Sequence, residues 1–185
     1  MKTASWLTSL ALTMTSDTAD RMIVDFRAPT KASPWRIVND DVMGGRSSSR
    51  FQLLATGGAV FSGVVSLENR GGFASARSAP VPDHLEGSNT FVLRVRGDGR
   101  AYQFTVQTGA GFNAPSYRLA FTPTRGEWGE YQLAFDDFAP TFRGRVLANL
   151  PPLTAEQIVS VGVLIADQRA GPFELEISWV KVATR

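Results

Sequence analysis

Apolar and polar residues alternate along much of the chain after Met22, which is the pattern of half-buried β-strands. The clearest alternation covers residues 91–96 and 102–107. Gly97, Asp98 and Gly99 stand between these segments, and glycine readily adopts the positive φ angles of a tight turn. The two segments are therefore predicted to form a β-hairpin.

Further strands are expected at residues 22–26, 59–68, 73–78, 117–122, 128–134, 160–166 and 173–182. Gly and Pro residues separate them at spacings typical of a sandwich. In the last strand, Phe173, Leu175, Ile177 and Trp179 are predicted to point one after another into the interior. A capping-box pattern predicts one short helical turn at 154–158. The fold class expected from this pattern is all-β, an antiparallel β-sandwich of two stacked sheets.

A length of 185 residues suits a single hydrophobic core, and 43% hydrophobic with 19% charged residues is an ordinary globular composition. We predict one β-sandwich domain over 22–185, preceded at 1–21 by an N-terminal extension or weak signal-like segment. That segment is apolar but interrupted by Thr and Ser. The cytoplasm is the expected compartment, with export through a weak N-terminal signal as the alternative. No transmembrane segment is predicted.

Several function classes are disfavoured by composition. Nineteen basic and seventeen acidic side chains leave a net charge of +2, too small to predict nucleic acid as a partner. The chain has no Cys, and its one histidine, His84, lies in a polar loop without a serine motif beside it. The common zinc sites and nucleophilic triads cannot be built from these residues. We therefore expect no enzyme activity, no catalytic residue, no bound metal and no cofactor.

The run NDDVMGGR, residues 39–46, is the most unusual stretch of the chain. It lacks the Lys and Ser or Thr of a phosphate-binding loop, and it lacks the ligand spacing of a calcium-binding helical hand. A calcium ion held by Asp40 or Asp41 with more distant acids stays open as an alternative. The favoured interpretation is a turn in which Asn and Asp side chains bond the local backbone.

In this structural interpretation Met43 is an apolar plug at the sandwich edge, and the arginines complete a buried polar network. Arg46 and Arg77 are expected to pair with Asp40, Asp41 or Glu68. The alternative is a ligand or partner patch in which four side chains line one surface: Asn39, Asp41, Arg46 and Arg77.

Several motifs occur in a fixed order along the chain: Trp35–Ser47, Phe61–Asn69, Gly71–Arg77, Arg94–Arg100 with Tyr102, Trp128, Asp137–Gly144 and Gly162–Phe173. Together they resemble the mitochondrial complex I intermediate-associated protein family, over nearly all of 22–181. The resemblance implies a galactose-binding-like jelly roll, similar to several carbohydrate-binding modules. It also implies a non-enzymatic, chaperone-like protein that binds a protein partner, either respiratory complex subunits or assembly factors. Here it indicates a stand-alone bacterial member.

A carbohydrate-binding module is the alternative function, because such a module needs only aromatic platforms and a few polar side chains on one sheet. Trp128 and Tyr102 are the candidate platforms, although Tyr102 shares a strand face with apolar residues and is also a candidate for the core. The polar side of the expected hairpin would supply Arg94, Arg96, Gln103 and Gln107. The arginines also allow RNA stacking, but the low net charge argues against that partner.

Overall fold

The computed structural model describes residues 20–28, 34–81, 85–109 and 114–185. One sheet contains β1 (Arg21–Asp25), β3 (Ser48–Leu53), β4 (Ala59–Val65), β6 (Thr90–Gly97), β9 (Trp128–Ala134) and β13 (Gly171–Ala183). The other contains β2 (Arg36–Asn39), β5 (Ala74–Arg77), β7 (Tyr102–Gln107), β8 (Ser116–Phe121), β10 (Ala139–Phe142), β11 (Arg145–Val146) and β12 (Ser160–Ile165). The predicted antiparallel β-sandwich is confirmed.

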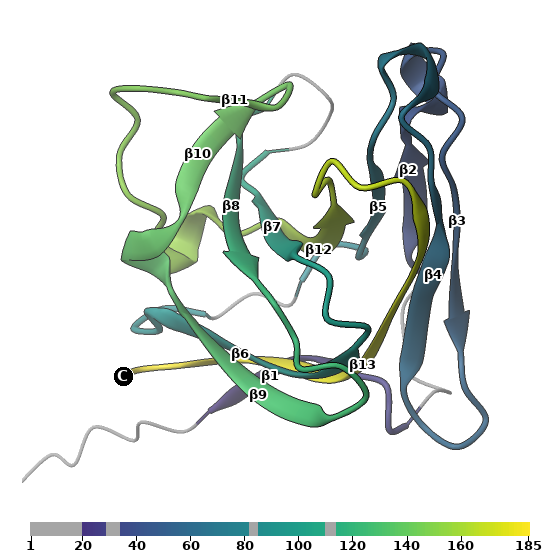
Figure 1. Cartoon of the computed structure of the whole chain (residues 1–185). Coiled ribbons are helices and arrows are strands. Elements are labelled where there is room, and N and C mark those ends of the chain that lie inside the picture. Colours follow the sequence, from purple (N-terminus) through teal and green to yellow (C-terminus); the bar gives the residue numbers. More distant parts are fainter. Residues whose placement is uncertain (1–19, 29–33, 82–84, 110–113) are drawn as a thin grey trace, which may run out of the picture.

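The six-stranded sheet has the order β3-β4-β13-β6-β9, with β1 also paired to β13, and the seven-stranded sheet has the order β11-β10-β8-β7-β12-β5-β2. Figure 1 shows the two sheets meeting where β2 and β5 lie beside β3 and β4. Short 3-10 turns join the strands: η2 (Asp40–Met43), η3 (Glu68–Arg70), η4 (Phe135–Asp137) and η5 (Ala155–Gln157). The described residues contain no helix long and apolar enough to cross a membrane.

The expected strands and the helical turn are all present, the turn as η5, where Gln157 Oε1 accepts the backbone N–H of Thr154 at 3.2 Å. Sequence patterning missed four strands, β2, β3, β10 and β11. Three of them, β2, β10 and β11, have only two to four residues, so their alternation is hard to recognise in sequence.

The hairpin expected from 91–107 is wrong. β6 pairs with β13 and β9 in the six-stranded sheet, whereas β7 pairs with β12 and β8 in the seven-stranded sheet. The connection between them crosses the sandwich. Asp98 holds the crossing because its carboxylate accepts the Tyr102 hydroxyl at 3.1 Å and the backbone N–H of Glu174 at 3.0 Å. Alternating strands and turn glycines fit a hairpin and a crossing equally well, so the sequence pattern could not separate them.

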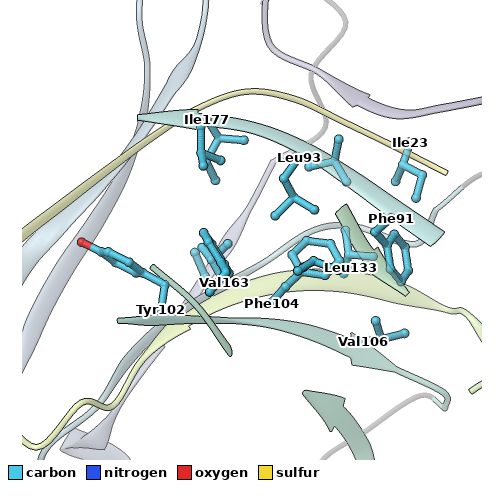
Figure 2. Packing of buried hydrophobic residues seen from close by; sticks show 14 of the residues in the cluster. Ile23, Phe91, Leu93, Tyr102, Phe104, Val106, Leu133, Val163 and Ile177 are labelled. Atoms are coloured by element: carbon cyan, nitrogen blue, oxygen red, sulfur yellow. The ribbon is translucent and has the colours of Figure 1, made fainter. Parts of the chain in front are cut away.

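The core lies between the sheets and is rich in aromatic rings (Figure 2). Phe91 of β6 meets Phe104 of β7 edge to face, with ring centroids 4.9 Å apart. Leu93 and Ile177 project from one sheet toward Val163 of the other. Burial of these side chains supplies the main favourable term in folding.

The last strand departs from simple alternation. Leu175 and Ile177 enter the core as predicted, but the register shifts between Ile177 and Trp179. This irregularity turns Trp179 to the outer side of the sheet, where it packs with Val92 and lies under the ammonium group of Lys181. The predicted inward position of Trp179 is therefore wrong, because a bulge inserts an extra residue and reverses the alternation beyond it.

Candidate functional site

Asp40 is fully buried at the end of β2, and its carboxylate is the centre of a hydrogen-bond network. It accepts the backbone N–H of Ser47 at 2.8 Å, the Ser47 hydroxyl at 2.5 Å, and the backbone N–H groups of Gly72 and Phe73 at 2.6 and 3.2 Å. Burial alone would raise the pKa of Asp40, but these hydrogen bonds outweigh it and hold the pKa below its ordinary value. Because donors occupy both carboxylate oxygens, Asp40 serves the fold and not a cation.

The turn around Asp40 explains one glycine of NDDVMGGR. A Cβ at Gly45 would lie 2.4 Å from the Asp40 carboxylate, so only glycine fits this close approach. Met43 is 67% exposed, which corrects the expectation that it plugs the sandwich edge. Val42 is also exposed, at 66%. The turn is thus organised by the buried aspartate and leaves its apolar pair in solvent.

Three predicted site residues, Asn39, Asp41 and Arg46, lie around this turn. Asn39 Oδ1 accepts the Ser49 hydroxyl at 2.6 Å, while Asp41 is exposed at the start of η2. Arg46 pairs with Glu68 at 3.0 Å as expected, but both side chains are more than 60% exposed, so the pair is superficial and not part of a buried network. No group of three or more Asp, Glu or His side chains in the described ranges could hold a metal ion.

A second group of predicted residues, Arg94, Arg96 and Trp128, forms what we call the tryptophan patch on the outer side of the six-stranded sheet. The guanidinium carbons of Arg94 and Arg96 lie 5.6 and 5.2 Å from the Trp128 ring centroid. Glu130 and Glu176 in turn pair with these arginines at 3.5 and 2.5 Å. Cation–π contacts with two arginines therefore already engage Trp128, which weakens its role as a sugar platform.

Tyr102, the other proposed platform, is fully buried and belongs to the core. The connection from β6 to β7 also separates the residues assigned to the expected hairpin. Arg94 and Arg96 lie on the outer side of the six-stranded sheet, whereas Gln103 lies on the outer side of the seven-stranded sheet. The structure therefore does not place these polar side chains on one surface.

Arginines from three strands line up across the outer side of the seven-stranded sheet. In the strand register, Arg36 of β2 lies opposite Arg77 of β5, Arg77 opposite Gly162 of β12, Gly162 opposite Thr105 of β7, and Thr105 opposite Arg118 of β8. Directly opposed residues share one side of a sheet. We call the side that carries Arg36, Arg77 and Arg118 the arginine face.

The arginine face is polar yet sheltered. Several side chains on this side are buried although they point away from the core: Ser75, Thr105, Gln107, Ser116 and Thr141. Their burial means that neighbouring side chains cover much of the middle of the face. Polar groups held in such a place have less competition from water, so they bind polar ligands more strongly than fully exposed groups.

The charges on this face are closely spaced. Burial lowers the pKa of Arg77, and the positive charge of Arg36 lowers it further. Burial likewise lowers the pKa of Arg118, with a contribution from the charge of Arg77. Neither Arg77 nor Arg118 forms an ion pair with a carboxylate of the described residues. This face is the best candidate functional site on the described part of the chain.

Of the predicted site residues, the structure brings Arg77 and Gln103 together on the arginine face, on the strands that flank β12. Arg36 and Arg118 were not predicted. The polar position of Arg118 between Tyr117 and Leu119 was visible in the sequence, but only the strand register sets it in line with Arg77. His84 lies outside the described residues.

Two of the motifs that carry the family resemblance meet in a buried ion pair. Arg100 donates to both carboxylate oxygens of Asp167, at 2.6 and 2.9 Å, and to the carbonyl oxygens of Gly171 and Pro172 at 3.1 and 2.8 Å. Burial would raise the pKa of Asp167, but Arg100 holds it below the ordinary value. Like the Asp40 network, this pair is structural: it closes the β6–β7 connection against the end of β12.

The fold is a galactose-binding-like β-sandwich of the kind found in carbohydrate-binding modules. The family 11 carbohydrate-binding module of cellulase Lic26A-Cel5E from Clostridium thermocellum matches with a TM-score of 0.65, covering 91% of this chain and 96% of the module at 16% identity. The family 11 module from the same organism in complex with a β-1,3-1,4-mixed-linked tetrasaccharide matches with a TM-score of 0.61 at 14% identity, covering 89% and 95% of the two chains. At these identities the likeness concerns the fold.

The chain belongs to the complex I intermediate-associated protein 30 (CIA30) family, whose model matches residues 24–177. The mitochondrial complex I intermediate-associated protein 30 of Drosophila melanogaster is 26% identical over 181 residues, covering 86% of this chain and 61% of the relative. The Mus musculus protein of the same name is 28% identical over 184 residues, covering 89% and 56%. The chain therefore spans less than two thirds of the length of these curated relatives.

Proposed function

We propose that this chain is a non-enzymatic binding domain that acts through a protein partner during assembly of a respiratory complex. Family membership supports the assembly role, since the curated relatives are named for intermediates of complex I. The observation that supports the binding role is the arginine face, where sheltered polar side chains surround Arg77 and Arg118. These two arginines form no ion pair with a carboxylate of the described residues. We keep the cytoplasm as the predicted compartment.

The arginine face is suited to a protein partner because its polar side chains can donate to carboxylates and carbonyl oxygens. Arginine is enriched in protein interfaces, where its planar group forms several hydrogen bonds at once. The turn that holds Asn39, Asp41 and Arg46 is a separate surface at the end of the sandwich. We assign the primary contact to the arginine face, because Asp40 of the turn is buried and bonded within the fold, and Arg46 is already paired with Glu68.

Site-specific photo-cross-linking tests this assignment. A photoreactive residue at Gln103 samples the arginine face, and one at Gln132 samples the outer side of the six-stranded sheet as a matched control. After irradiation in native membrane extracts, we expect subunits or assembly factors of a respiratory complex to cross-link from position 103 and not from 132. Cross-links that are absent at both positions, or equal at both, would contradict the proposal.

A carbohydrate is the second candidate ligand, favoured by the similarity of fold to modules that include a tetrasaccharide complex. Two features of the structure argue against a carbohydrate ligand. The strand positions described on the arginine face carry no aromatic side chain on which a sugar could stack, and Trp128 is engaged by arginines. Titration with a β-1,3-1,4-linked oligosaccharide is expected to give no binding heat.

A further inference from the structure

Arg77 and Arg118 lie in one row of paired strand positions across the middle of the arginine face. The two residues are separated by β12 and β7, which places their Cα atoms about 14 Å apart at the usual strand spacing. A Cβ at Gly162 would lie 3.3 Å from Arg77 Cγ, so the stem of Arg77 leans over the glycine toward β7. The electrostatic effect of Arg77 on Arg118 agrees with guanidinium groups that approach each other.

The floor beneath these groups is closely packed. Gly162 has no side chain, and a Cβ there would also come within 2.8 Å of Thr105 Oγ1. Arg118 is held by a hydrogen bond on its own strand, because its Nε donates to Ser116 Oγ at 3.3 Å. The Ser116 hydroxyl in turn lies 3.1 Å from the Thr141 hydroxyl. These hydrogen bonds position the Arg118 side chain, and the glycine at position 162 lets the stem of Arg77 lie close against the sheet.

This arrangement of two arginines raises the free energy of the folded chain when no anion is bound. Both arginines are partly buried, their charges repel, and no carboxylate among the described residues pairs with either of them. Guanidinium groups bind planar carboxylates and phosphate oxygens through parallel N–H bonds. An anion placed between them would neutralise the repulsion and satisfy donors that the fold leaves available.

We infer that Arg77 and Arg118 form a binding site for a single oxyanion, a carboxylate or a phosphate group, above Gly162 and Thr105. The site goes beyond the proposed assembly function, to which it would contribute by receiving an acidic group of the partner. The chemistry is the same for both anions, and direct titration distinguishes them.

Calorimetric titration of the whole chain with inorganic phosphate, and separately with glutarate as a dicarboxylate, tests the site at constant ionic strength set with NaCl. We expect binding of one or both anions, weakened at least about tenfold in Arg77→Gln and in Arg118→Gln, because each substitution removes a charged donor. Arg50→Gln is the control, since Arg50 is exposed on β3 and bonds only the exposed side chain of Gln52. Stronger binding of phosphate or of glutarate assigns the natural anion to that class.

Thermal unfolding without added anion separates a binding role from a structural one. We expect Arg77→Gln to unfold at the same temperature as the wild type or higher, because the substitution relieves repulsion. A clearly lower midpoint for Arg77→Gln would contradict the proposed site. So would anion binding that is absent, or that is equal in the wild type and all variants. The titration uses no partner protein, so a negative result leaves the cross-linking test of the proposed function standing, and the reverse also holds.

Discussion

The Asp40 carboxylate accepts the backbone N–H of Ser47 at 2.8 Å, which ties the end of β2 in one sheet to the residue that precedes β3 in the other. The same carboxylate bonds Gly72 and Phe73 just before β5. A single buried side chain therefore fastens the β2–β3 and β4–β5 connections where the sheets meet. It is the residue of NDDVMGGR on which the local fold depends.

Replacing Asp40 should be far more damaging than replacing its neighbour. Asp40→Ala leaves several buried donors without an acceptor, and we expect the free energy of unfolding to fall by about 3 kcal/mol. Asp41→Ala is the matched control, and at this exposed position we expect a change below about 0.5 kcal/mol. Urea unfolding followed by tryptophan fluorescence measures both, and equal losses would contradict the central role of Asp40.

Asp40 should also make stability depend on pH. Its pKa is lowered in the folded state, so the unfolded chain takes up the proton first as the pH falls. The contribution is complete above about pH 5, where the aspartate of the unfolded chain is fully ionised, and is lost as the pH falls through the lower folded-state pKa.

Urea unfolding between pH 7 and pH 2.5 checks this dependence. We expect the difference in stability between wild type and Asp40→Asn to be constant near neutrality and to shrink below about pH 4. Asp167 titrates in both proteins and cancels in the difference. A gap between the two proteins that stays constant down to pH 2.5 would show that Asp40 is not the group responsible.

The buried Arg100–Asp167 pair should outweigh an exposed pair of the same chemistry. Arg100→Ala leaves Asp167 buried without its cation, and we expect a loss of about 3–5 kcal/mol. Arg94→Ala breaks the exposed contact with Glu130 and should cost less than about 1 kcal/mol. Chemical denaturation of both variants makes the comparison, and similar losses would mean that burial does not set the strength of these pairs.

Gly162 should resist even a methyl group. A Cβ there would lie 2.6 Å from the carbonyl oxygen of Ala76 and 2.8 Å from Thr105 Oγ1, and the backbone atom cannot move without disturbing the sheet. We expect Gly162→Ala to lower stability by about 1–3 kcal/mol through overpacking. Ser160→Ala, on the same side of the same strand, is the control. Thermal unfolding measures both variants, and a larger loss of stability in Ser160→Ala would contradict close packing at Gly162.

Much of the fold follows from local pattern. The alternation in β6, β7, β9 and β12 predicted the strands and the sandwich because one side of each strand must be buried. The buried strands carry long alternating runs, so they were recognised. The edge strand β11 and its neighbour β10 are short and were missed.

Long-range pairing decided the rest. Whether β7 turns back on β6 or crosses to the other sheet depends on Asp98, Arg100 and their contacts more than sixty residues away, which turn residues do not encode. The same holds for the candidate site. Arg77 was visible as a polar position, but its neighbours Arg36 and Arg118 come from other strands, and only hydrogen-bonded register sets them in one row. Periodicity specifies which side of a strand is buried in the core. The pairing of strands in the folded sheets specifies which residues meet on the outer side.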